Sequence, residues 1–105
     1  MRGNADNIRF ALTPLRRLKG LIGLQHLEGV LLLAPCHDIH TFGMQMNIDV
    51  AFIDADGKVL CVEADVPPRK RIRCCGALVV LERQASAEPW FQAGDALCLD
   101  VANSP

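Results

Sequence analysis

The chain has 105 residues, of which 50% are hydrophobic and 22% are charged, and its formal net charge is −1. This length suits a single domain over residues 1–105, and the apolar fraction excludes an intrinsically disordered chain. The near balance of charges argues against a polyanion-binding protein as a whole. The longest apolar run, Val30 to Cys36, is far shorter than the roughly 20 residues of a bilayer-spanning helix, so no membrane span is expected.

The N-terminal part predicts one short strand followed by one helix. Residues 1–7 are polar and are expected to fray, whereas large apolar residues alternate over 8–12, as in a strand. Thr13 offers a hydroxyl N-cap, and Pro14 takes the first helical position, where its missing N–H costs nothing. Apolar residues then recur at helical spacing at Leu15, Leu18, Leu21 and Ile22. We therefore expect a helix that starts at Thr13 and spans about two or three turns.

Strand patterns dominate from Gly29 onward. Val30–Leu33 is apolar on both faces of a strand, and Pro35 ends this run. In the segment from His40 to Met46, large aromatic or apolar side chains occupy alternate positions, so we expect this segment to be extended. An extended chain places His40, Phe42, Met44 and Met46 on one face.

The sequence Asp54-Ala55-Asp56-Gly57 is the best hairpin signal in the chain. It lies between two β-rich runs, 48–52 and 59–64, and an Asp-Gly pair favours the tight turn that joins antiparallel strands. The prolines at 67 and 68 end the second run. We therefore expect these two strands to be direct neighbours in a sheet.

The C-terminal part predicts a last pair of strands at Ala77–Arg83 and Ala96–Val101. Between them, Ser86–Gln92 favours a short second helix that Ser86 caps and Gly94 closes. Strands outnumber helices, and most neighbouring strands can be joined in antiparallel fashion by short loops. The predicted fold class is α+β: a mainly antiparallel, twisted or barrel-like sheet with one N-terminal helix packed on it and the short second helix.

Cysteine usage points to a reducing compartment. The five cysteines are an odd number, no secretory leader is recognisable in the first 20 residues, and no Cys-x-x-Cys pair occurs. Cys74 and Cys75 are adjacent, and a bond between neighbours in a strand would be strained. We therefore expect reduced thiols and a cytoplasmic location.

The densest set of chemically functional side chains lies around Cys36. His40 or His37 could take the proton of the Cys36 thiol and leave a thiolate nucleophile, which makes Cys36 and His40 the candidate catalytic residues. Alternatively, the sulfur and ring nitrogens could bind a transition metal, with Asp38 or Asp49 as a further ligand. A third interpretation is structural: a buried cysteine, with the histidines bonded to backbone groups. No metal site is assigned from this pattern.

Basic residues form two clusters. The first contains Arg16, Arg17 and Lys19, and the second contains Arg69, Lys70, Arg71 and Arg73. Two clusters that met in space could bind nucleic acid. However, the second cluster follows a Pro-Pro break and contains no aromatic residue on which a base could stack. A solvated loop explains it better, so a nucleic-acid partner is not expected.

Several motifs resemble a bacterial and archaeal family of unknown function, domain-of-unknown-function family 192, over about residues 9–100. The motifs are Arg17-Leu18-x-Gly20-Leu21, Gly29-Val30-Leu31-Leu32, Pro35-Cys36-x-x-Ile39-His40-Thr41-Phe42-x-Met44, Ile48-Asp49-Val50-x-Phe52-Ile53-Asp54, Asp56-Gly57, Pro67-Pro68-x-Lys70, Val80-Leu81-Glu82 and Gly94-Asp95. Many relatives carry Phe-Trp-Met-x-Asn-Thr where this chain has the segment 40–44, so the chain resembles a Cys/His branch. The resemblance implies a compact β-rich domain with a helix near the N-terminus. It implies no reaction, so no catalytic residue is carried over.

Asp49 is the most informative of the motif residues on physical grounds. It interrupts an apolar strand, and a buried carboxylate needs hydrogen-bond donors or a cation. We expect Arg17, His40 and Thr41 to supply them. The candidate ligand-binding residues are therefore Arg17, Cys36, His40, Thr41, Phe42, Met44 and Asp49.

The leading functional hypothesis is a small non-enzymatic accessory domain that binds a small molecule or a peptide. Its expected pocket lies at one end of the sheet, lined by His40, Phe42 and Met44, with Arg17 and Asp49 at its floor. The alternatives are a Cys/His-dependent enzyme and a transition-metal-binding domain. The sequence specifies no cofactor and no oligomeric state.

Overall fold

The computed structural model describes residues 8–11 and 29–97, which form seven β-strands. The strands are β1 (Ile8–Ala11), β2 (Val30–Leu33), β3 (Asp38–His40), β4 (Ile48–Ile53), β5 (Val59–Val66), β6 (Arg71–Arg73) and β7 (Val79–Gln84). No residue of these two segments is helical. The described residues therefore hold no helix that could cross a membrane.

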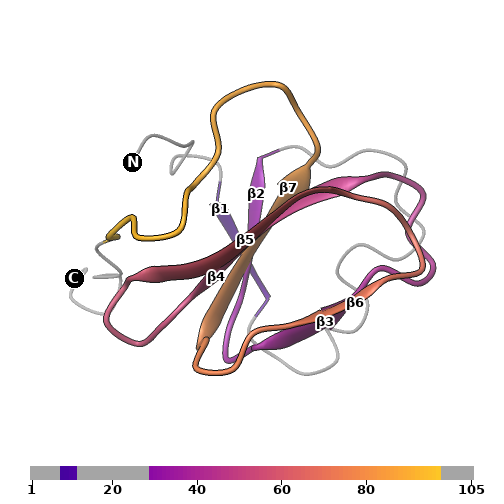
Figure 1. Cartoon of the computed structure of the whole chain (residues 1–105). Helices are drawn as coiled ribbons and strands as arrows, with labels where there is room; N and C mark the ends of the chain where they lie inside the picture. The colour runs from indigo at the N-terminus through magenta and orange to yellow at the C-terminus, as the bar shows by residue number, and fades with distance from the viewer. Residues whose placement is uncertain (1–7, 12–28, 98–105) are drawn as a thin grey trace.

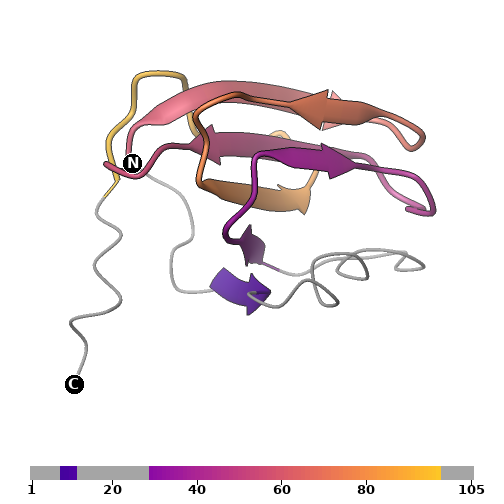
Figure 2. The same cartoon turned by 90° about the horizontal axis from the view of Figure 1, so that it is seen from below.

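The strands form one large sheet and one small one. The large sheet has the order β1-β2-β7-β4-β5, and Figure 2 shows its strands following one another from β5 at the top to β1 at the bottom. β1 runs parallel to β2, and the other neighbours are antiparallel. β3 and β6 pair with each other as an antiparallel ribbon, which lies beside the large sheet at the lower right of Figure 1.

The predicted hairpin at Asp56-Gly57 is confirmed. β4 and β5 pair in antiparallel fashion on either side of it, and the Asp54 carboxylate accepts the N–H groups of Asp56 and Lys58 at 2.8 and 2.9 Å. Gly57 has a φ of 88°, and a Cβ added there would lie 2.1 Å from the carbonyl oxygen of Leu97. Only glycine therefore fits this turn.

Two apolar clusters lie on opposite faces of the large sheet, because alternate residues of β4 join different clusters. The first, here called the ribbon-side core, contains Val50 and also Ile39 from β3, so the ribbon covers this face. The second contains Ala51 and Phe91, so the segment after β7 covers the other face. β4 is consequently buried along its whole length, and one of its residues is the carboxylate Asp49.

The α+β class is wrong for the described residues, which are all-β and form two separate sheets rather than a barrel. The predicted short helix over 86–92 does not form. Carbonyl groups of this segment accept hydrogen bonds from the Arg83 guanidinium instead of from helical N–H groups, and Pro89 has no N–H to donate. The predicted N-terminal helix from Thr13 lies outside the described residues, as does most of the last predicted strand.

The expected extended segment from His40 to Met46 is also wrong beyond its first residue. β3 ends at His40, and the chain then turns, with Gly43 at a φ of 83° and the N–H of Met44 bonded to the carbonyl of Thr41 at 3.2 Å. The turn buries Met44 in the ribbon-side core and leaves Phe42 exposed. Alternation of residues had predicted that Phe42 and Met44 share one face. This pattern is local and does not reveal the turn that separates them.

Candidate functional site

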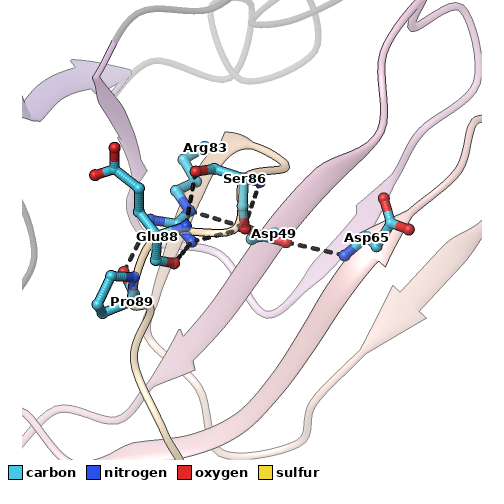
Figure 3. A network of polar contacts seen from close by, with 6 residues as sticks. All are labelled: Asp49, Asp65, Arg83, Ser86, Glu88 and Pro89. Atoms are coloured by element: carbon cyan, nitrogen blue, oxygen red, sulfur yellow. Dashed lines mark hydrogen bonds and ion pairs between the residues drawn. The ribbon is translucent and has the colours of Figure 1, made fainter.

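Asp49 is buried in β4, with 3% of its surface exposed, and it accepts hydrogen bonds from three described residues. Its Oδ2 atom accepts the Nε–H of Arg83 at 2.8 Å and the N–H of Ser86 at 3.3 Å, and Oδ1 accepts the N–H of Asp65 at 2.9 Å (Figure 3). Asp49 and Arg83 are direct partners in the β4–β7 register. The carboxylate is therefore balanced by a cation from the neighbouring strand.

Arg83 continues this network away from Asp49. Its Nη atoms donate to the carbonyl groups of Ser86, Glu88 and Pro89, and its Cζ atom lies 4.5 Å from the ring centroid of Trp90. The guanidinium thereby attaches the segment 86–90 to the sheet. Because these contacts satisfy both ions, the pair acts as a structural clamp.

The structure places the donors expected for Asp49 elsewhere. Thr41 Oγ1 donates to the carbonyl of Pro67 at 2.8 Å, and Nδ1 of His40 accepts the N–H of Phe42 at 3.2 Å. Arg17 lies outside the described residues. Arg83 was missed, although the charged pair Glu82-Arg83 follows the apolar residues 79–81 of β7, and a charge within a strand is the same signal that singled out Asp49 in β4.

Glu82 is a second buried carboxyl, on the opposite face of β7 from Arg83. Its register partners are Leu31 of β2 and Val50 of β4, which belong to the ribbon-side core. Burial raises the pKa of Glu82 to about 8, so the carboxyl is mostly protonated at neutral pH. No described donor or cation contacts it, in contrast to Asp49.

One end of the ribbon brings together exposed cations and rings that are far apart in the sequence. His40 lies opposite Arg71 in the register, and the N–H of Thr41 donates to the carbonyl of Lys70 at 2.8 Å. We name the exposed residues at this end the ribbon surface; they are His40, Phe42, Arg69, Lys70 and Arg71. Thus the aromatic residues that the second basic cluster lacks in sequence are supplied by the chain beside it.

Thr41 connects the two chain segments that form the ribbon surface. It is completely buried, and its hydroxyl accepts the N–H of Lys70 at 2.8 Å while donating to Pro67. Its carbonyl accepts the N–H of Arg69 at 3.3 Å. These bonds attach the loop between β5 and β6 to the end of β3.

The ribbon surface carries an excess of positive charge. The Asp38 carboxylate accepts hydrogen bonds from Nε and Nη2 of Arg71 at 3.1 and 2.6 Å. The Nε atom of Arg73 lies 3.5 Å from Oδ2 of Asp38. Its hydrogen bond with Arg71 is the main reason that the pKa of Asp38 is lowered. Arg69 and Lys70 form no ion pair with the described residues. Asp38 therefore pairs with Arg71 and Arg73, and the charges of Arg69 and Lys70 are not balanced by any described carboxylate.

The remaining candidates do not assemble into the expected pocket. Met44 is buried in the ribbon-side core, whereas Asp49 lies on the opposite face of β4. Cys36 packs at the edge of that core, and its thiol donates to the carbonyl of Asp38 at 3.4 Å. Within the described residues, no three His, Cys, Asp or Glu side chains are placed to hold a metal ion.

Comparison with known sequences decides the family. The sequence profile of DUF192, a family described as an uncharacterized ACR, matches residues 1–96. The chain belongs to the DUF192 family. The resemblance drawn from the motifs is thereby confirmed, and no curated protein matches the chain.

Two solved structures have the same fold as this DUF192 chain. A protein of unknown function from Novosphingobium aromaticivorans DSM 12444 matches with a TM-score of 0.68 and 21% identity, over 74% of this chain and 62% of its own. A protein from Sinorhizobium meliloti 1021, named as a candidate transcription regulator, matches with a TM-score of 0.67 and 20% identity, over 74% of this chain and 67% of its own. At these identities the likeness concerns the fold alone.

Proposed function

We propose that this DUF192 chain is a non-enzymatic binding domain that holds an acidic peptide segment on the ribbon surface. The observation that carries the proposal is the position of Phe42, which is 51% exposed and directly follows Thr41, the residue that is bonded to the backbone of the exposed cations Arg69 and Lys70. Aromatic and arginine side chains are enriched in contact surfaces between proteins, so their combination here favours a contact surface.

The charge of this face favours an anionic partner. Arg69 and Lys70 have no carboxylate partner among the described residues, and the Arg71 side chain is 62% exposed although it pairs with Asp38. The carboxylates of a partner could form ion pairs with these three cations at the exposed surface, where little desolvation is required. Electrostatic attraction would also speed its approach.

The two rings supply an apolar contact within the same face. The ring centroids of His40 and Phe42 lie 5.6 Å apart with a tilt of 48°, and the hydrogen bond from Phe42 N to His40 Nδ1 fixes their relation. A leucine or aromatic side chain of a peptide could pack on Phe42 while neighbouring acids reach Lys70. Burial of one large apolar side chain contributes about 1.5–3 kcal/mol.

A peptide suits this surface better than a small molecule or a nucleic acid. A small ligand needs a concave site that surrounds it, and the candidate pocket residues lie on different faces of the sheet. A nucleic acid needs a longer charged track with several stacking rings, whereas Phe42 is a single large exposed ring among the described residues.

The proposal is tested by fluorescence anisotropy with a labelled peptide of alternating glutamate and leucine. We expect saturable binding that weakens as salt is added. Phe42→Ala should weaken binding about tenfold, and the double change Arg69→Ala with Lys70→Ala about fivefold to tenfold.

Two matched variants serve as controls. Lys58→Ala removes an exposed cation from the β4–β5 turn, and Leu78→Ala removes an apolar side chain that is 43% exposed outside the ribbon surface. Neither should change the affinity. Equal losses in the control variants, or equal binding of a lysine–leucine peptide, would refute the proposal. Stronger binding of single-stranded DNA than of the acidic peptide would replace it with nucleic-acid binding.

A further inference from the structure

Two cysteines from different elements bring their sulfur atoms together. Cys61 lies on β5, opposite Phe52 of β4, and Cys74 directly follows β6. Their Sγ atoms are 2.9 Å apart. A disulfide has a sulfur–sulfur distance of about 2.05 Å, so the two atoms need to approach by less than about 1 Å to form one.

The two thiols differ in their surroundings. Cys61 is exposed, whereas Cys74 is buried with 6% of its surface accessible and packs in the ribbon-side core. Burial, followed by the hydrogen bond with Cys61, raises the pKa of the Cys74 thiol to about 11. A solvent-borne oxidant therefore reaches Cys61 first, and Cys74 is held in contact as the second thiol.

We propose that Cys61 and Cys74 are a modification site, a dithiol that low-molecular-weight disulfides such as oxidised glutathione convert reversibly into an intramolecular disulfide. This site is separate from the ribbon surface and does not depend on peptide binding. The observation that carries it is the direct contact of the exposed Cys61 on β5 with the buried Cys74 that follows β6.

The reaction proceeds in two balanced exchanges. The Cys61 thiolate, having released its proton to water, attacks one sulfur of oxidised glutathione; the glutathione S–S bond breaks, and a thiolate leaves. Cys74 then loses its proton and attacks Sγ of the mixed disulfide at Cys61, which releases the second glutathione as a thiolate. The two released thiolates take up two protons. The protein dithiol is oxidised by two electrons, and one glutathione disulfide is reduced to two thiols.

The new bond would link β5 to the end of β6. It closes a loop from Cys61 to Cys74 that contains β6 and the loop carrying Arg69 and Lys70. Covalent closure removes conformations from the unfolded chain. For a loop of this length in a small domain, the melting temperature is expected to rise by about 10 °C.

The test uses the full chain, reduced and then incubated with oxidised glutathione. We expect intact-mass spectrometry to show a loss of about 2 Da per chain, and peptide mapping to link Cys61 to Cys74. Cys74→Ser should stop the reaction at a glutathione adduct on Cys61. Cys61→Ser should prevent the loss of mass, whereas the control Cys75→Ser, an exposed neighbour, should retain it.

A second measurement covers the case of a variant that does not fold. Peptide mapping and the melting temperature of the oxidised wild type need no substitution, and dithiothreitol should reverse both changes. The proposal is overturned if the wild type gains only glutathione adducts, or if its disulfide joins Cys75, Cys36 or Cys98. It is also overturned if oxidation leaves the melting temperature unchanged.

Discussion

Neighbouring residues of β7 show how differently two buried charges can be accommodated. Arg83 points to one face of the large sheet and contacts Asp49, three backbone carbonyls and Trp90. Glu82 points to the other face and meets apolar side chains of the ribbon-side core. Arg83 is paired with a carboxylate and with carbonyl groups, whereas Glu82 contacts no described donor or cation and burial raises its pKa.

Removal of one partner of the clamp should destabilise the protein strongly. Asp49→Ala leaves the Arg83 guanidinium buried without its counter-ion, so we expect the free energy of unfolding to fall by about 3–5 kcal/mol. Denaturant titration measures this loss. Arg73→Ala, which removes an exposed member of the Asp38 ion pair, is the control and should have a much smaller effect. Similar losses in both variants would contradict the clamp.

Glu82 should make stability depend on pH. Its pKa is 4.5 in the unfolded chain and about 8 in the folded protein, so the unfolded chain holds fewer protons between these values. The free energy of unfolding should therefore be highest at and below pH 4.5 and fall by up to about 1.4 kcal/mol per pH unit as the pH rises towards 8. Denaturant titrations at several pH values measure the slope. Glu82→Gln should remove this contribution, and an unchanged slope in that variant would contradict the assignment.

At the scale of the element, turns determine where the strands end. The β4–β5 hairpin was predictable because Asp54, Asp56 and Gly57 carry the turn chemistry locally. The end of β3 was not, because it depends on the contact of Thr41 with the loop near Lys70, far along the chain. A turn that is specified by its own residues can be recognised in sequence, and one specified by a distant contact cannot.

Gly57 and Gly94 allow the cost of backbone strain at a positive φ to be separated from the cost of a steric clash. Both have positive φ angles, 88° and 98°, but an added Cβ at Gly57 would overlap the Leu97 carbonyl, whereas none of the described atoms lies within 4 Å at Gly94. Gly94→Ala should cost only backbone strain, about 1–2 kcal/mol, and Gly57→Ala should cost distinctly more. Thermal unfolding of both variants measures the difference. Equal costs would show that the carbonyl contact has no influence.

At the scale of the whole molecule, the sequence predicted the strands better than their arrangement. Alternation located the strand near Ile8 and β4, a continuous apolar run located the strand near Val30, and the strand near Val80 was also expected, because these patterns are local. The pairing of Asp49 with Arg83 depends on β4 lying beside β7, which no local pattern encodes. The contact between Cys61 and Cys74 was missed for the same reason, and the two cysteines were predicted only to be reduced. The turn after His40 separates the exposed Phe42 from Met44, which is buried in the ribbon-side core.

The position of β7 has a consequence for synthesis of the protein on the ribosome. β7 is the last strand of the described chain, yet it lies in the middle of the large sheet, between β2 and β4. Until Gln84 has left the exit tunnel, the strands on either side have no partner along the edge that β7 will occupy. The nascent chain therefore exposes the open edges of the β1–β2 pair and of the β4–β5 pair. A translation stop before β7 would release an aggregation-prone fragment.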